Sequence, residues 1–341
     1  MLVSNLLGPK QFSKFDGKFV CATRQCDKNS QKNCYLRWED PPNPFFNFLM
    51  LAMNTSLQHL PAIKREQVET IIKIVRQAVN PEKIILFGLY STSGAGAGIF
   101  SESHFPAGVA TYDLLVVTRQ GDRRSDYELQ DIIENRCRGR VPVTVLVHDI
   151  DHVNSRLAEG NYFFTMLIRE AILLYDAGII PLAGARKPPD LLQIRVLAEK
   201  DFERWRLQAR AFFRSAVFNR QHKEWRVAIF LLHQAAEHIY QGILLAFTGY
   251  KPTTHNLDKL RRYTNRFSIE LTMLFPRDNE EEDRLFRLLL QGYVDARYKA
   301  EYNISEEDVG LLTGRVDLLL SIAERICRNR FLSLEKMATG E

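Results

Sequence analysis

The residues best suited to chemistry lie in a stretch, residues 84–118, where two apolar runs flank a loop rich in Gly, Ser and Ala. Gly88 ends the first run, and Ser91 and Ser93 follow it. Asp113 is the one carboxylate inside the second run. Backbone N–H groups and hydroxyls in such a turn can hold phosphate oxygens, and a carboxylate can hold a divalent cation. The stretch therefore predicts a phosphate or nucleotide site at Gly88, Ser91, Ser93 and Asp113.

Two common phosphate-binding motifs do not fit this loop. A Walker loop needs a Lys after its last glycine, and no Lys follows these glycines. A dinucleotide fingerprint needs G-x-G-x-x-G, whereas Gly94, Gly96 and Gly98 are evenly spaced. A third arrangement fits better, in which a strand ends in Gly, a Ser-rich turn follows, and a later strand carries the acidic residue.

That arrangement resembles the minimal nucleotidyltransferases of the DNA polymerase beta type. The resemblance implies a Gly-Ser pair, a D-x-D pair and a third carboxylate, which together hold Mg²⁺ with ATP or another NTP. Here Leu89 stands at the Ser position, Thr111 at the first Asp and Thr144 at the third carboxylate. Asp113 is then the only metal ligand and the catalytic residue of any surviving activity. An alternative interpretation makes Asp113 a hydrogen-bonded residue at a strand edge.

The sequences "AIFLLHQAAEHIYQGILLAFTGYKPTTHNLDKLRRY" (228–263) and "PRDNEEEDRLFRLLLQGYVDARYKAEYNIS" (276–305) resemble HEPN domains (higher eukaryotes and prokaryotes nucleotide-binding). Many HEPN ribonucleases carry an Arg followed by a His. The resemblance places that Arg at Arg297, but Tyr302 stands where the His is expected. Because a Tyr is a poor base at neutral pH, we expect no ribonuclease activity of that type. Arg297, Tyr298, Lys299 and Tyr302 could still bind a phosphate or an RNA base, or form a polar loop between helices.

Other polar clusters have plainer interpretations. "HDIDH" (148–152) could be a metal site, but Asp151 is expected to cap a helix. His233 and Glu237 lie one turn apart and are expected to form a buried hydrogen-bonded pair in the bundle. Arg206, Arg210 and Arg214 form a stripe that is either a solvated face or an RNA surface.

These residues need two kinds of scaffold. Residues 53–180 alternate helical and strand-like patterns, with strands expected at 83–88, 112–118, 141–147 and 171–176 and helices at 61–79, 125–138 and 153–170. Residues 181–194 have the composition of a linker. Residues 195–332 predict five amphipathic helices, at about 195–220, 224–247, 255–267, 279–297 and from Ser305, followed by a tail at 333–341. The fold prediction is a nucleotidyltransferase-like α/β domain with a mixed sheet, then an all-α HEPN bundle.

Composition sets outer limits on function. The chain has 341 residues, a net charge of +5 and five scattered cysteines, which favour a reducing compartment over a disulfide framework. No apolar run is long enough for a membrane helix, so we expect a cytoplasmic protein. Residues 1–52 show no sustained periodicity and precede "MNTSLQHLPAIKREQVETIIKIV". They are expected to be a disordered extension or the product of a mis-called start, with Met53 as the natural initiator.

The function expected from these patterns is nucleotide or RNA binding, with reduced or absent catalysis, in a regulatory protein of the toxin–antitoxin or defence type. The HEPN bundle is expected to form a homodimer. Two alternatives stay open. The first is an active metal-dependent transferase that moves AMP or another nucleoside monophosphate to a protein Tyr or a small molecule. The second is a homodimeric scaffold without a ligand.

Overall fold

A computed structural model describes residues 11–15, 18–26, 34–38, 53–91, 96–99, 110–184, 190–299 and 301–340. The chain divides into two compact units, Met1–Phe48 and Leu49–Glu341. Ser93 lies outside the described residues, and for Ser91 only the backbone is described.

The first unit contains a small antiparallel sheet in the order β1-β2-β3. Its strands are β1 (Gln11–Phe15), β2 (Lys18–Cys26) and β3 (Cys34–Trp38). The sequence pattern gave no sign of these strands, because neither alternation nor turn residues mark them clearly. That residues 1–52 are an extension of the natural protein stays a prediction.

The second unit is built on a mixed five-stranded sheet in the order β5-β4-β6-β7, with β8 also paired to β4. The strands are β4 (Lys83–Ser91), β5 (Gly96–Gly98), β6 (Ala110–Thr118), β7 (Val143–Asp149) and β8 (Ile172–Asp176). β4 runs antiparallel to β6, and β6 runs parallel to β7. The mixed sheet and four of its strands match the sequence prediction.

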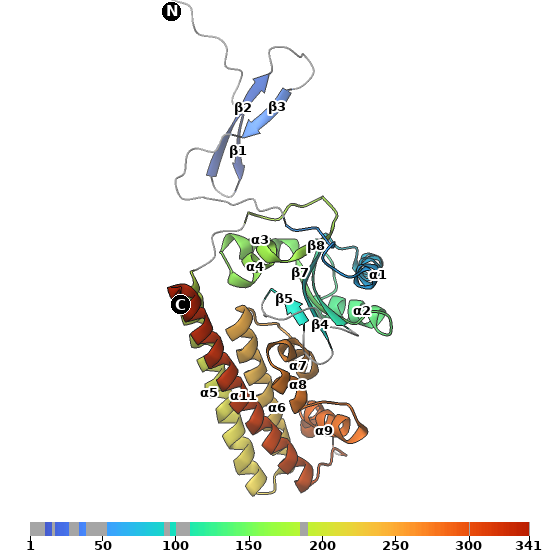
Figure 1. The fold of residues 1–341 in the computed structure, drawn as a ribbon, viewed down its shortest axis with the longest axis vertical. Coiled ribbons are helices and arrows are strands. Elements are labelled where there is room, and N and C mark those ends of the chain that lie inside the picture. Colours follow the sequence, from blue (N-terminus) through green and yellow to red (C-terminus); the bar gives the residue numbers. More distant parts are fainter. Residues whose placement is uncertain are drawn as a thin grey trace, which may run out of the picture. The chain divides into compact units, whose positions relative to one another are not determined.

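Both faces of this sheet are buried, which explains the unbroken apolar runs in its central strands. Ile84 and Leu86 pack with α1 (Ala62–Val79) and α2 (Asp126–Cys137) on one face. Ile85 and Phe87 belong to a second core on the other face, with α3 (Ile150–Ala158) and α4 (Tyr162–Glu170). Figure 1 shows α1 and α2 on one side of the sheet and α3 and α4 on the other.

The sheet and helices α1–α4 form one half of the second unit, the sheet half. Two local predictions in the sheet half need correction. The helix expected over 153–170 is two helices, because Gly160 adopts a φ of 74° and Asn161 caps a new helix. Asp149 caps α3 in place of Asp151, and its side chain accepts a hydrogen bond from the His152 N–H at 2.8 Å. The helix begins three residues earlier than the apolar pattern indicated.

The helical half is dominated by three long helices that pack side by side, α5 (Leu191–Gln221), α6 (Trp225–Thr248) and α11 (Glu306–Thr339) (Figure 1). Shorter elements complete it: α7 (Leu257–Thr264), η1 (Asn265–Phe267), α8 (Ile269–Leu274), α9 (Glu280–Gln291) and α10 (Asp295–Tyr298). The helix expected over 279–297 is interrupted after Gln291, and α8 was not expected. α11 begins after the predicted cap Ser305 but continues through most of the predicted tail, 333–341.

The two halves share one apolar core. The cluster that contains Ile85 and Phe87 of the sheet continues through α4 into Phe202, Ile239 and Leu320 of the helical half. Residues 181–184, the described start of the predicted linker, carry no helix or strand. The two halves are therefore held together by this shared core, and not by a helix or strand in residues 181–184.

Gly88 in β4 gives a test of this packing. A Cβ there would lie 2.4 Å from Cε2 of Tyr90 and 2.9 Å from Oδ2 of Asp113. We expect Gly88→Ala to lower the free energy of unfolding by about 1–3 kcal/mol. Urea denaturation of the variant measures this change.

Gly314 in α11 provides a matched control, because an added Cβ there meets nothing within 4 Å. Gly314→Ala should raise the free energy of unfolding by roughly 0.5–1 kcal/mol, since Ala is the better helix former. A neutral Gly88→Ala would show that β4 is less tightly packed than described.

Candidate functional site

A cleft of about 780 Å³ lies where the sheet meets the short helices of the helical half. The sheet side contributes side chains from β4, β6 and β7 together with the end of α2. The helical side contributes α7, η1, α8, α9 and the segment between α8 and α9. The lining carries five arginines and four carboxylates: Arg138, Arg261, Arg262, Arg266, Arg277, Asp113, Glu134, Asp258 and Asp283.

The floor of the cleft includes Asp113 and Thr144, which pair on adjacent strands, and Gly88 pairs with Asp113 from the other side. Gly88 of β4 pairs with Asp113 of β6, and Asp113 pairs with Thr144 of β7. A register shift between Leu86 and Gly88 brings the β4 backbone close to the Asp113 carboxylate. The structure thus places Gly88, Asp113 and Thr144 on adjacent strands, while the predicted nucleotide site at Gly88, Ser91, Ser93 and Asp113 stays a prediction.

Asp113 is neutralised by an arginine from the other half of the unit. Nη1 of Arg266, in η1, contacts Oδ2 of Asp113, and both side chains are buried, at 8% and 2% exposure. The Arg266 guanidinium also lies 4.9 Å from the Tyr90 ring centre. Burial raises the pKa of Asp113 to about 6, although Arg266, Arg262 and a hydrogen bond from Thr144 lower it.

This arrangement does not fit a divalent metal. Asp113 is the single carboxylate on the floor. Thr111 and Thr144, where a nucleotidyltransferase-like fold would predict the other two ligands, carry neutral hydroxyls, and Leu89 is buried in the core. Across the described residues, no group of three or more His, Cys, Asp or Glu side chains could hold a metal ion. The positive charge that a metal would supply comes from Arg266.

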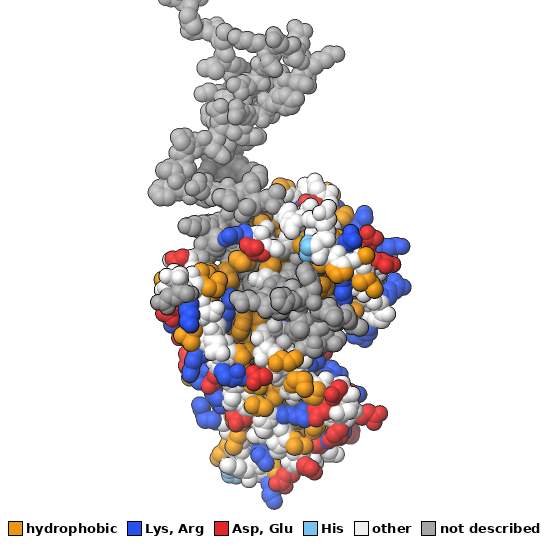
Figure 2. Space-filling model, in the orientation of Figure 1, with side chains coloured by type: hydrophobic (Ala, Val, Ile, Leu, Met, Phe, Trp, Pro, Cys, Tyr) orange, Lys and Arg blue, Asp and Glu red, His pale blue; other side chains and the backbone are white. Residues whose placement is uncertain are grey.

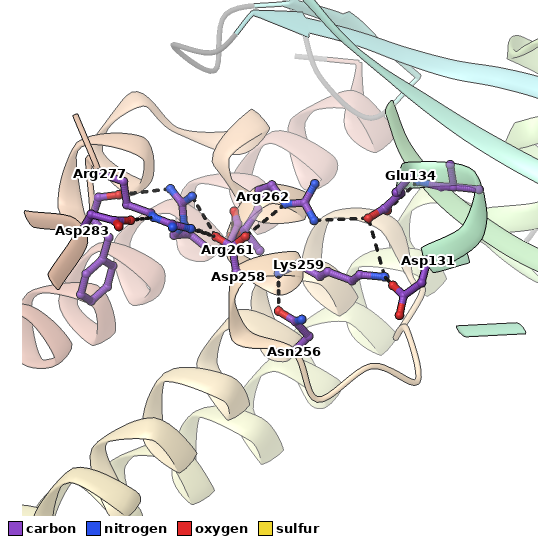
Figure 3. Close-up of polar contacts among 12 residues, drawn as sticks. Asp131, Glu134, Asn256, Asp258, Lys259, Arg261, Arg262, Arg277 and Asp283 are labelled. Atoms are coloured by element: carbon purple, nitrogen blue, oxygen red, sulfur yellow. Dashed lines mark hydrogen bonds and ion pairs between the residues drawn. The ribbon is translucent and has the colours of Figure 1, made fainter. Parts of the chain in front are cut away.

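A chain of ion pairs crosses the cleft wall and ties α2 to α7 and α9 (Figure 3). Asp258 of α7 lies at its centre, with Arg261 Nη2 at 3.0 Å and Arg277 Nη1 at 3.2 Å. Burial opposes ionisation of Asp258, but these arginines outweigh it and lower its pKa. The chain continues in one direction from Arg277 to Asp283, at 2.5 Å, and in the other from Arg262 through Glu134 and Lys259 to Asp131.

Some donors in the cleft are not used by these pairs. Arg138 is exposed and has no partner among the residues that the structure describes. Nε of Arg266 is buried and donates no hydrogen bond within the described part of the chain, and Oδ1 of Asn265 accepts none there. The cleft therefore offers spare donors beside a neutralised carboxylate. Figure 2 shows basic and acidic side chains interspersed over one face of the molecule, so no broad basic surface is visible on that face.

Sequence reasoning did not predict a role for three of the cleft arginines, Arg261, Arg262 and Arg266. They lie in "LDKLRRYTNR" (257–266), a run in which four basic residues follow an N-capped helix start. A helical wheel can suggest the local pairs with Asp258, but it cannot predict the pairs of Arg266 with Asp113 and of Arg262 with Glu134, which are more than a hundred residues away in the chain. Only the docking of α7 and η1 on the sheet assigns them to the Asp113 cleft.

The second predicted site, on and after α10, is partly as expected. Arg297 and Lys299 are exposed, and Tyr298 is 74% exposed. Tyr302 is different, because it is buried and its hydroxyl donates to the Leu288 carbonyl at 3.0 Å. Tyr302 therefore stabilises the bundle and does not share a surface with the other three residues.

The structure adds an imidazole to this α10 surface. The Arg297 guanidinium lies 4.5 Å from the Tyr293 ring centre, and His255 stacks on the same ring at 6.4 Å. His255 is 66% exposed, and its Nδ1 lies 2.8 Å from Oε1 of Glu237. His255 precedes α7 and is far from Arg297 in sequence, so motif spacing could not identify it.

Glu237 also has His233 beside it, and both are buried as the sequence predicts, but the predicted hydrogen bond between their side chains is not formed. The His233 Nε2 lies 3.7 Å from Oε2 of Glu237, and Nδ1 donates to the Leu289 carbonyl. Burial alone would raise the pKa of Glu237, but His233 and His255 outweigh it and lower that pKa. On the predicted Arg stripe, Arg206 and Arg210 form ion pairs with Glu324, which favours the solvated-face interpretation.

Comparison with known families covers the helical half. Residues 202–326 match the HEPN domain family. This match confirms the HEPN part of the predicted architecture, whereas the nucleotidyltransferase-like part stays a prediction. No protein of curated function matched the chain. Among the described residues, no helix is both long and apolar enough to cross a membrane.

The raised pKa of Asp113 predicts a pH dependence of stability. The folded state holds the proton to about pH 6, whereas the unfolded chain loses it near pH 3.8, so stability falls as pH rises through that interval. Relative to Asp113→Asn, the wild-type protein should lose up to about 3 kcal/mol of unfolding free energy between pH 4 and 7.

Urea denaturation of both proteins across that pH range measures the difference, and the shared background of other titrating groups cancels. If the wild-type protein instead gains unfolding free energy relative to Asp113→Asn as pH rises, the effect of Arg266 on the pKa of Asp113 is larger than the effect of burial.

Proposed function

We propose that the protein is a nucleotide-binding regulatory protein whose cleft holds the phosphates of a nucleotide and has little or no transferase activity. The observation that carries the proposal is the arginine-lined cleft above an Asp113 already paired with Arg266. Nucleotide phosphates are the ligand chemistry that several convergent guanidinium groups recognise best, because each planar fork can make two parallel hydrogen bonds.

The reduced catalysis follows from the same geometry. Transfer of a nucleoside monophosphate needs metal ions held by several carboxylates to neutralise charge and activate the attacking hydroxyl. Asp113 is alone on the floor and occupied by Arg266. The alternative of an active transferase would require Arg266 to leave a buried ion pair, which is costly because it strands two charges.

The HEPN match supports a regulatory role of the toxin–antitoxin or defence type, since HEPN domains are generally linked to RNA and to such systems. We also propose that the bundle pairs with a second copy of the chain. Leu311, Leu318 and Leu332 of α11 are about half exposed and recur at multiples of seven residues, which places them on one side of the helix. A homodimeric scaffold without a ligand stays as the alternative.

Nucleotide binding is testable by thermal denaturation in the presence of ATP, GTP, CTP and UTP. A nucleotide at a hundred times its Kd should raise the Tm by several degrees, because it stabilises the folded state by about 2.7 kcal/mol. Arg138→Gln removes an exposed donor without breaking an internal ion pair, and should weaken binding about tenfold.

Arg123→Gln is the matched control, since Arg123 is an exposed arginine that does not line the cleft. A Tm that no nucleotide changes would contradict the proposal. So would equal losses of affinity in the two variants.

A second candidate function is RNA binding at the α10 surface, favoured by the contact of both Arg297 and His255 with Tyr293. Arg297 would hold a phosphate, and the exposed ring of Tyr298 would stack on a base. The free Nε2 of His255 would accept the proton of a 2′-hydroxyl as that oxygen bonds to phosphorus. The bond from phosphorus to the 5′-oxygen would break, and water would protonate the leaving oxygen.

Single-stranded RNA with a fluorescent label provides the test. Tyr298→Ala should cost about 1–3 kcal/mol of binding free energy in an anisotropy titration, the usual value of one stacked base. Tyr127→Ala, at another exposed tyrosine, should change nothing. If RNA is cleaved, His255→Ala should abolish cleavage while His222→Ala retains it. Unchanged affinity in Tyr298→Ala would exclude this surface.

A further inference from the structure

We infer that the cleft binds its nucleotide as a metal-free polyphosphate, with Arg266 as a built-in cation in place of a divalent metal ion. The inference rests on the proposed nucleotide binding and specifies its ligand form. It predicts that Mg²⁺ weakens binding, the opposite of the behaviour expected of a metal-dependent transferase.

The position of Arg266 is the first support. Its guanidinium contacts the only carboxylate on the cleft floor, opposite Gly88 and next to Thr144. The guanidinium is held between that carboxylate and the Tyr90 ring, whose centre is 4.9 Å away. The Arg266 side chain is only 8% exposed. A fixed, desolvated positive charge therefore lies where a metal ion would need to enter.

The electrostatics of the cleft are the second support. A divalent ion at the floor would find one carboxylate, already paired, and the positive charges of Arg262 and Arg266 around it. Its approach is opposed by repulsion that a low-dielectric site strengthens. A nucleotide that carries Mg²⁺ also presents less negative charge to the arginines than the free nucleotide does. Both effects favour the metal-free ligand.

Unused hydrogen-bonding groups are the third support. Nε of Arg266 is buried without an acceptor in the described residues, although the guanidinium lines the cleft. Oδ1 of Asn265, the preceding residue, is buried without a donor there. A bound nucleotide would satisfy both, with a phosphate oxygen accepting from Arg266 and an amino or hydroxyl group donating to Asn265.

The experiment is an isothermal titration of the full chain with ATP, GTP, CTP, UTP and inorganic tripolyphosphate, in EDTA and in excess Mg²⁺. We expect binding in EDTA that is at least about tenfold tighter than in Mg²⁺, the loss expected when phosphate charge is shielded from arginines. Tripolyphosphate should show the same preference. Binding that appears only with Mg²⁺, or is tighter with it, overturns the inference but leaves nucleotide binding intact. Absence of binding under both conditions overturns both.

Variants then assign the effect to Arg266. Arg266→Met should weaken binding in EDTA about tenfold, as for the loss of one charge-assisted contact. Arg266→Lys should restore part of it. Arg328→Gln, an exposed arginine on α11, should bind like the wild-type protein. Since Arg266→Met leaves a buried Asp113 without its partner, Asp113→Asn/Arg266→Met keeps the test decisive if the single variant fails to fold. If the folded variants bind the nucleotide in EDTA as tightly as the wild-type protein does, the proposed role of Arg266 is wrong.

Discussion

The ion pair between Asp113 and Arg266 links the sheet to the helical half of the second unit. Each partner comes from a different half of the unit, and each is almost fully buried. Removing both charges from water costs several kcal/mol, and each charge offsets part of the cost of burying the other. The pair therefore exists only when η1 is docked on the sheet. The cleft walls, the ion-pair chain from Asp283 to Asp131 and the shared core all presuppose that docking.

The same pair bears on both properties proposed for the cleft, phosphate recognition and the lack of transferase catalysis. Phosphate recognition needs donors and positive charge, and the cleft retains these through arginines of α7 and η1. Catalysis of nucleotide transfer needs carboxylates that are free to hold metal ions, whereas the cleft residues beside Asp113 on β6 and β7 include the neutral Thr111 and Thr144. The helical half thus contributes four of the five arginines that line the cleft, whereas the glycine-rich loop belongs to the sheet.

Much of this fold could be predicted from the sequence. Strands and helices with strong periodicity were placed well, since burial on both faces of the sheet or on one stripe of α11 leaves a regular pattern. The resemblance drew Asp113 and Thr144 together as metal-ligand positions, whereas their pairing with Gly88 on adjacent strands is known only from the sheet register. The partner of Asp113 could not be predicted, because a long-range ion pair leaves no local signal. His255 escaped for the same reason. Tyr302 was misplaced because its chemistry suggested exposure, whereas a single hydrogen bond to Leu288 allows its burial.

The continuous apolar core has a consequence for how such a protein can change over evolutionary time. Ile85 and Phe87 of the sheet lie in the same cluster as Ile239 and Leu320 of the bundle. Exchange of the helical half for an unrelated module would leave the far face of the sheet uncovered and prone to aggregation. A recombination event between the two halves would produce a protein in which this shared core has no matching surface. The halves are therefore constrained to be inherited as a matched pair.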